Sequence, residues 1–343
     1  MDKHRLPSKP HYSEKAVALI GYGVTGKACA RYLLAQGAKL SVFDKATHLE
    51  KEDPKSADIA FYSLNENTQL HNFDYVVVSP GVNLTQGFIQ DYLSKTAGSA
   101  APRVIGDIEL FAQELSTNAL INLQHEQSQQ VPLLIGITGS NGKSTVVDML
   151  AQGLTAAGLK VGLGGNFGTS ALDMLNQQYE VIVLELSSFQ LESTYSLSLD
   201  IACMLNLTSD HIDRHGSMMA YGAAKRRIYL HAKHIVVNRD DPQTWPSQTV
   251  LSAHNGFTLA SFGSANPQKQ QEDLIYYHNE QGIFERRIES EQKTQNEACL
   301  VENEACLMEY EACLMENTQL MQTQSKKTAD NTFEKMASDT HAH

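Results

Sequence analysis

The chain has 343 residues, of which 42% are hydrophobic and 19% are charged, with 27 Lys and Arg against 39 Asp and Glu. This length allows two or three domains with substantial cores, and the formal net charge of −12 argues against nucleic acid as the main partner. The sequence has no apolar run of the roughly 18 residues that a membrane span needs, and its polar N-terminus lacks the apolar stretch of a signal peptide. We therefore expect a cytoplasmic protein without a membrane partner.

The first part of the chain alternates strand and helix patterns. Residues 16–44 read as a buried strand, a glycine turn, a helix and a second strand. Another apolar run covers 75–78 and ends in Ser-Pro-Gly, and a helix is expected near 86–95. This alternation predicts a parallel sheet covered by helices.

A glycine turn follows the first predicted strand. Residues 21–26 spell GYGVTG, a full GxGxxG, and Asp44 ends the next strand eighteen residues after Gly26. This pattern is typical of dinucleotide sites, because glycines let a diphosphate approach the backbone and the carboxylate can accept from a ribose. Any nucleoside diphosphate would fit the same turn, UDP included, and a bare tight turn and an NAD-dependent oxidoreductase remain open.

A second glycine-rich turn predicts a nucleoside triphosphate site. After a linker and helix at 104–115, the strand LLIGIT runs into Gly-Ser-Asn-Gly-Lys-Ser-Thr at 139–145. Such a turn directs backbone N–H groups and a helix N-terminus at one point. Lys143 would contact the terminal phosphates, and the hydroxyl of Ser144 or Thr145 would hold Mg²⁺. The loop is a variant, since the first glycine of the usual pattern stands at 136 rather than 137.

Polar side chains follow the later strands, which are expected within 181–187, 201–208 and 233–241. Glu185 ends a buried strand, which is a usual place for a Mg²⁺ ligand, and His211 is a candidate second ligand with a structural role as the alternative. On the helix expected at 221–229, the residues alone predict that Lys225 is a solvated lysine.

The C-terminal part differs in composition. NEACLVE, NEACLME and YEACLME repeat every seven residues over 296–316, which predicts a low-complexity tail that is helical or disordered. No CxxC pair occurs among the five cysteines. Cys29 and Cys203 lie in apolar contexts and are expected to be buried thiols in a reducing compartment.

Four segments, taken together, resemble the Mur ligase family. They are GITGSNGKST (136–145), LELSSFQLE (184–192), LNLTSDHIDRH (205–215) and AAKRRIY (223–229), and GDIELF (106–111) and SPG (79–81) fit the same family. The resemblance covers about 15–290 and is closest to the members that add D-glutamate. It implies a Rossmann-like UDP-substrate domain at 1–106, an α/β ATPase domain of the P-loop type at 107–290, and the tail at 291–343.

The resemblance also implies roles for single residues. It places ATP on the loop that begins at Gly139 and catalytic functions on Lys143, Lys225 and His211. Lys225 corresponds to a lysine that the family carbamylates, and the carbamate then ligates the second of two Mg²⁺ ions. The implied ATP-binding residues are Gly139, Ser140, Asn141, Gly142, Lys143, Ser144 and Thr145. The implied metal ligands are Ser144, Glu185, His211 and Lys225, and the implied substrate-binding residues are Val24, Thr25, Asp44, Ser79, Gly81, Asn166, Ser187 and Gln190.

The implied activity is an ADP-forming ligation in peptidoglycan synthesis, with links to cell-wall biogenesis, cell shape, cell division and the cell cycle. ATP would activate the carboxylate of UDP-N-acetylmuramoyl-L-alanine as an acyl phosphate, and D-glutamate would then attack it. We expect a monomer. Segments typical of the family's third domain, which binds D-glutamate, do not occur in this sequence. The alternative is therefore a catalytically incompetent remnant that still binds ATP and the UDP-sugar.

Overall fold

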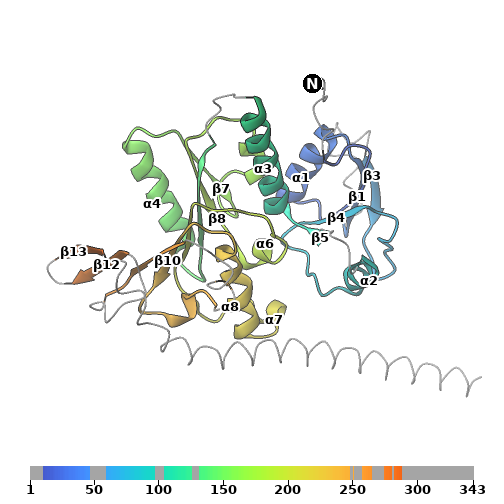
Figure 1. Ribbon diagram of the computed structural model, residues 1–343. Coiled ribbons are helices and arrows are strands. Elements are labelled where there is room, and N and C mark those ends of the chain that lie inside the picture. The colour runs from blue at the N-terminus through green and yellow to red at the C-terminus, as the bar shows by residue number, and fades with distance from the viewer. Residues whose placement is uncertain are drawn as a thin grey trace, which may run out of the picture. The chain divides into compact units, whose positions relative to one another are not determined.

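The computed structural model describes residues 11–46, 59–96, 104–125, 131–247, 250, 257–264, 274–279 and 282–287. One compact unit, formed by 1–245 and 254–288, contains two sheets with helices against them (Figure 1). A second unit is formed by 246–253 and 289–343, and only residues 246, 247 and 250 of it are described. The heptad repeat and the predicted tail lie outside the described residues.

The first sheet is parallel and has the strand order β3-β2-β1-β4-β5. Its strands are β1 (Ala16–Ile20), β2 (Lys39–Asp44), β3 (Ile59–Ser63), β4 (Tyr75–Val78) and β5 (Val104–Ile105). The predicted parallel sheet is thus confirmed. The expectation of a linker at 104–105 is wrong, because Val104 and Ile105 pair with Val76 and Val77. A two-residue strand is too short to produce a periodic pattern.

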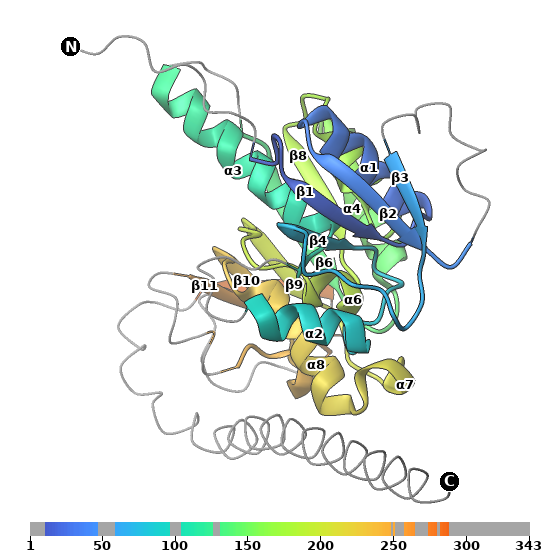
Figure 2. The same ribbon diagram turned by 90° about the vertical axis from the view of Figure 1, so that its right-hand side faces the viewer.

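Two helices cover the first sheet. α1 (Val24–Ala35) and α2 (Gly87–Thr96) lie on its opposite faces, as Figure 2 shows. Ala18 and Ile20 pack with Ile89 and Tyr92 of α2, whereas the alternate residues Val17 and Leu19 point to the other face. Both faces of the central strand are buried, which explains its continuous apolar run.

The second sheet has the order β13-β12-β11-β10-β9-β6-β8-β7. All its neighbouring strands are parallel except β12 and β13, which pair antiparallel. Its strands are β6 (Leu133–Thr138), β7 (Val161–Gly165), β8 (Val181–Glu185), β9 (Ile201–Met204), β10 (His234–Asn238), β11 (Thr258–Phe262), β12 (Leu274–Asn279) and β13 (Gly282–Arg287). The predicted strands correspond to β6, β8, β9 and β10.

The remaining helices connect these strands. They are α3 (Asp107–His125), α4 (Lys143–Ala156), α5 (Ala171–Met174), α6 (Ser188–Glu192), α7 (Ile212–His215), α8 (Met218–Arg226) and the 3₁₀ turns Arg227–Tyr229 and Pro242–Thr244. Of these, α3 contacts α1, and Tyr32 Oη donates a 2.8 Å hydrogen bond to Glu114. The bounds predicted for the domains remain predictions.

Strand order decides where ligands can bind. In the first sheet β1 lies between β2 and β4, and in the second β6 lies between β8 and β9. The strand order therefore reverses at β1 in the first sheet and at β6 in the second. In parallel sheets of this kind, ligands bind outside the carboxyl ends of the strands at the point where the order reverses. Both predicted glycine-rich turns occupy such positions.

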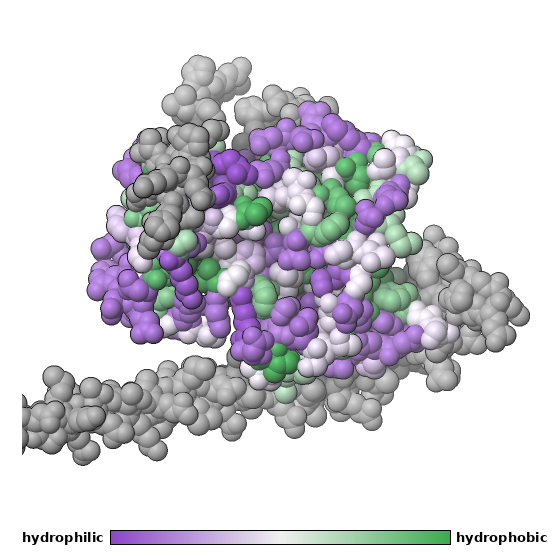
Figure 3. All heavy atoms as spheres, turned by 180° about the vertical axis from the view of Figure 1, so that it is seen from behind, coloured by the Kyte–Doolittle hydropathy of each residue, from purple (hydrophilic) through white to green (hydrophobic). Residues whose placement is uncertain are grey.

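The surface on the face that Figure 3 shows is mostly hydrophilic, and the described cysteines are buried. Hydrophobic residues are scattered over this face. In the described part of the chain, no helix combines the length and the apolar character that a bilayer span requires. Cys29 and Cys203 are buried free thiols, as predicted, and burial raises the pKa of Cys203 to about 12.

Candidate functional site

The phosphate-type loop joins β6 to α4. Helix α4 begins at Lys143, and its N-cap is Gly142, whose φ of 76° lies in the left-handed region that favours glycine. The first N–H groups of a helix have no intrahelical acceptor, so the start of α4 offers donors to an anion. Lys143 Nζ lies 3.0 Å from the carbonyl oxygen of Ser140, so this amine lies over the loop.

The segment after β9 holds the loop in place. Asn206 Oδ1 accepts from the N–H of Asn141 at 2.9 Å, and Thr208 Oγ1 accepts from Asn141 Nδ2 at 2.9 Å. The Ser140 hydroxyl donates to the Thr208 carbonyl oxygen at 3.0 Å. The sequence marked this segment as polar but did not predict that Asn206 and Thr208 would anchor the loop, since that needs the adjacency of β6 and β9.

Glu185 lies where β8 ends and is 1% exposed. Its two carboxylate oxygens accept 2.7 Å hydrogen bonds, Oε2 from Ser144 Oγ and Oε1 from Asn166 Nδ2. The structure thereby joins three predicted site residues from three separate segments. A carboxylate and the hydroxyl that follows a phosphate-type lysine are oxygen ligands that Mg²⁺ accepts, so Glu185 and Ser144 fit this ion.

Lys225 is 2% exposed, so the expectation of a solvated lysine is wrong. Its Nζ donates to the carbonyl oxygen of Gly139 at 2.8 Å, because α8 packs its C-terminal half beneath the loop. Burial first, and then the charge of Lys143, lowers the pKa of Lys225 to about 7, although Asp210 and Glu185 act in the opposite direction. Burial and the charge of Lys143 both favour the uncharged form of the amine.

His211 is the N-cap of α7 and has a φ of 52°, a left-handed value that is uncommon outside glycine. Its ring lies 4.8 Å from the ring of Phe189 and its Nε2 lies 3.4 Å from Asp210. No hydrogen bond joins His211 to Glu185 in the described part of the chain, where no group of three or more His, Cys, Asp or Glu could hold a metal. Its role as a metal ligand remains a prediction.

The predicted UDP site lies at the carboxyl edge of the first sheet. Asp44 Oδ2 accepts a 2.7 Å hydrogen bond from the N–H of Tyr22, and the Ser79 hydroxyl donates to the Gly21 carbonyl oxygen at 2.8 Å. Both side chains therefore shape the glycine turn. Val24 is 87% exposed at the start of α1, and that start has no side-chain cap. An open helix N-terminus beside a glycine turn suits a diphosphate.

Ser187 and Gln190 form a capping box at the start of α6. The Ser187 hydroxyl accepts from the N–H of Gln190, and Gln190 Oε1 accepts from the N–H of Ser187. Gln190 Nε2 donates at 3.0 Å to Asp107, which is 1% exposed. Burial raises the pKa of Asp107 to about 6, and its Oδ1 has no hydrogen-bond partner. The role of Asp107 behind these two residues was not predicted.

Two family profiles match the chain. Residues 137–299 match the Mur ligase middle domain, and residues 15–99 match the Mur ligase MurD-like, N-terminal domain. A solved structure, UDP-N-acetylmuramate:L-alanyl-gamma-D-glutamyl-meso-diaminopimelate ligase from Neisseria meningitides, aligns with a TM-score of 0.43 at 18% identity. That alignment covers 80% of this chain and 85% of the other.

Curated relatives give a closer likeness. UDP-N-acetylmuramoylalanine--D-glutamate ligase of Haemophilus ducreyi is 40% identical over 242 residues, which are 70% of this chain and 51% of that protein. The protein of the same name from Teredinibacter turnerae is 37% identical, over 79% of this chain and 56% of its own length. The chain thus spans about half the length of the curated relatives it matches. Since both profiles and these relatives agree, the chain belongs to the Mur ligase family.

Proposed function

We propose that this chain binds ATP at loop 139–145 and UDP-N-acetylmuramoyl-L-alanine at the carboxyl edge of the first sheet, and that it ligates D-glutamate to the latter in peptidoglycan precursor synthesis. The names of the curated relatives support this activity. The observation that carries the proposal is the pair of 2.7 Å hydrogen bonds from Ser144 and Asn166 to Glu185 beside the phosphate loop. Because its substrates are cytoplasmic metabolites, we also infer a cytoplasmic location.

Each residue at the loop has a separate task in this proposal. Lys143 lies over the loop and would offset charge on the terminal phosphates. Ser144 and Glu185, with His211, would hold Mg²⁺. When bound, this ion neutralises charge that develops on the transferred phosphoryl group. The anchors Asn206 and Thr208 keep the loop in shape, so little reorganisation is needed during the reaction.

Lys225 is the proposed site of carbamylation. A neutral amine adds to CO₂ to give a carbamate and one proton, and the lowered pKa of Lys225 supplies that neutral amine near pH 7. The product would be an anionic oxygen ligand for a second Mg²⁺ in place of a buried cation. This change would also remove the repulsion between Lys225 and Lys143.

The proposed reaction has two steps. The alanyl carboxylate oxygen attacks the γ-phosphorus of ATP, and ADP leaves as an acyl phosphate forms. The amine of D-glutamate then attacks the acyl carbon, and phosphate and one proton leave as the amide forms. Positioning and electrostatic stabilisation supply most of the acceleration in such transfers.

The test is phosphate release by the purified chain with ATP, Mg²⁺ and UDP-N-acetylmuramoyl-L-alanine, with and without D-glutamate. Release that depends on D-glutamate, together with the amide product in a mass spectrum, supports the ligase. A Lys143→Met variant controls for contaminating ATPases. No release by a chain that still binds both nucleotides in calorimetry would overturn ligation by this chain and favour the binding-only alternative.

A further inference from the structure

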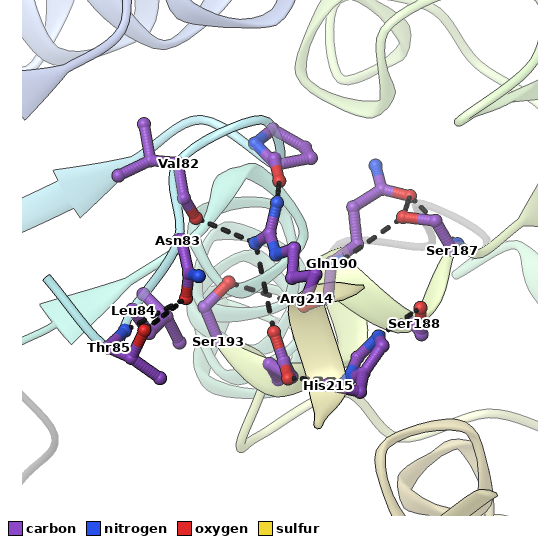
Figure 4. A network of polar contacts seen from close by, with 12 residues as sticks. Val82, Asn83, Leu84, Thr85, Ser187, Ser188, Gln190, Ser193, Arg214 and His215 are labelled. Atoms are coloured by element: carbon purple, nitrogen blue, oxygen red, sulfur yellow. Dashed lines mark hydrogen bonds and ion pairs between the residues drawn. The ribbon is translucent and has the colours of Figure 1, made fainter. Parts of the chain in front are cut away.

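Arg214 joins the loop after β4 of the first sheet to the part of the chain that carries the second sheet. Arg214 Nη1 donates to the carbonyl oxygen of Pro80 at 2.6 Å, and Nη2 donates to that of Val82 at 2.7 Å (Figure 4). These carbonyls lie on either side of Gly81, in the loop that follows β4. Two donors of one guanidinium therefore fix the direction of the loop as well as its distance.

The loop that Arg214 holds is itself ordered. The N–H of Val82 donates to the Ser79 carbonyl oxygen at 2.9 Å, and Asn83 Oδ1 accepts from the N–H and hydroxyl of Thr85. Ser79 in turn is hydrogen-bonded to the glycine turn at Gly21. Because the loop is a rigid turn, a change at Arg214 is transmitted to Ser79 and Gly81 together.

Arg214 is held on its own side as well. Its guanidinium carbon lies 3.7 Å from the centre of the Phe189 ring, and its Nη2 lies 3.8 Å from Glu192 Oε2. Glu192 Oε1 also lies 3.1 Å from Nδ1 of His215, whose side chain is 1% exposed. His215 Nε2 is 3.0 Å from the Ser188 hydroxyl. The guanidinium is thus oriented before any ligand arrives.

The same aromatic ring connects Arg214 to the nucleotide side. Phe189 packs against Arg214 and, at 4.8 Å, against the ring of His211. His211 is the N-cap of α7, and Arg214 lies within the single turn of this helix. Helix α7 therefore connects Arg214, which contacts the loop of the first sheet, with His211, which is proposed to lie at the ATP edge of the second sheet.

We propose that Arg214 is a positioning residue that sets the UDP-substrate loop 79–82 at the distance from the ATP edge that phosphoryl transfer requires. This inference rests on the proposed function. Transfer needs the acceptor oxygen in line with the γ-phosphorus, so an error in placing one sheet's ligand against the other's slows the reaction. Arg214 acts through the backbone of the loop and need not touch either substrate.

Arg214 is one of several contacts that join the two sheets. α1 also contacts α3 and α5, and Arg31 Nη2 pairs with both carboxylate oxygens of Asp173 at 2.8 and 2.9 Å. Removing Arg214 should thus leave the sheets attached and free only the loop. Arg31→Met is a matched control, because it removes an arginine that bridges the same two parts at a different place.

The test compares wild type, Arg214→Met, Arg214→Lys and Arg31→Met in calorimetric titrations with UDP-N-acetylmuramoyl-L-alanine and, separately, with ATP and Mg²⁺. We expect Arg214→Met to weaken binding of the UDP substrate about tenfold and to change the Kd for ATP less than twofold. Arg214→Lys should fall between, since it keeps the charge but contacts one carbonyl. Arg31→Met should match the wild type, and thermal unfolding checks that all four chains fold.

The outcomes separate the two proposals. If wild type binds the UDP substrate and Arg214→Met binds it within twofold, or loses ATP affinity equally, the role of Arg214 is overturned and the proposed function stands. If wild type does not bind the UDP substrate at all, the proposed function itself fails, and this inference fails with it.

Discussion

The amine of Lys225 lies 2.8 Å from the carbonyl oxygen of Gly139, so a residue of α8 supports a phosphate loop 86 positions earlier in the chain. This contact buries the amine of Lys225, a group that is normally charged. Burial, and after it the charge of the Lys143 amine, disfavours the charged form of Lys225, which explains why its pKa falls to about 7. The first prediction follows from that pKa.

Lys225 should add to the stability of the folded chain as the pH rises above 7. An unfolded lysine has a pKa of about 10.4, so between pH 7 and 10.4 the unfolded chain binds more protons than the folded chain. Lys225 should therefore contribute an increase of about 1 kcal/mol per pH unit to the free energy of unfolding in this window, and no slope below it. The buried thiol of Cys203 acts in the opposite direction above its unfolded pKa of about 8.5, so the Lys225 contribution is obtained by comparing chains that share this thiol. Urea unfolding in CO₂-free buffer at several pH values measures this.

Lys225→Met should remove the Lys225 contribution to the pH dependence of the free energy of unfolding, whereas Lys95→Met, which changes a half-exposed lysine of α2, should keep it. Equal slopes in all three chains would mean that Lys225 titrates as an ordinary lysine.

Glu185→Gln should weaken magnesium-dependent nucleotide binding. The amide keeps the shape that meets Ser144 and Asn166 but loses the negative charge that Mg²⁺ prefers. We expect the Kd for ATP with Mg²⁺ to rise about tenfold or more, and the Kd in EDTA to stay the same or fall. Asp148→Asn on α4 is the control. The prediction is wrong if both variants bind Mg²⁺ and ATP as wild type does.

Gly26→Ala should destabilise the turn of the first sheet. A Cβ at this position would collide with the Gly21 carbonyl oxygen and press on the Ser79 hydroxyl. We expect a loss of about 1–3 kcal/mol in the free energy of unfolding, which is usual for overpacking. Gly23→Ala is a close control, since its Cβ would meet nothing within 4 Å. If Gly26→Ala and Gly23→Ala had equal unfolding midpoints in guanidinium chloride, the predicted collision at position 26 would be wrong.

Glu109→Ala should destabilise the contact between α3 and the segment after α6. Glu109 is 2% exposed, and its carboxylate accepts from the N–H groups of Tyr195 and Ser196 at 2.7 and 2.8 Å. The substitution leaves both backbone donors without their charged acceptor, at a cost of about 3 kcal/mol. Asp91→Ala, which breaks an exposed ion pair with Lys95, should cost less than about 1 kcal/mol. Thermal unfolding compares them, and similar losses would argue against a special role for Glu109.

The parallel architecture could be predicted because its signals are local. Buried parallel strands such as Ala16–Ile20 and Val181–Glu185 read as unbroken apolar runs, and each glycine-rich turn directly follows one of them. The residues proposed to bind phosphate are contiguous at 139–145, so the sequence showed both their chemistry and their position after a strand.

Short or distant features were not predictable in this way. Val104 and Ile105 form a strand only because β4 offers backbone partners, and two residues carry no period. Asn206 and Thr208 hold the phosphate loop through the adjacency of β6 and β9, which is a property of the sheet order.

The sequence by itself determined the two glycine-rich turns, the strands that lead into them and the family, because each depends on residues that are neighbours along the chain. Only the tertiary structure decided that Lys225 is buried, that Ser144 and Asn166 share Glu185, and that Arg214 holds the loop at Pro80. The residues around Lys225 alone predicted a solvated side chain. Burial and pairing depend on which segments fold against each other, and a local pattern does not contain that information.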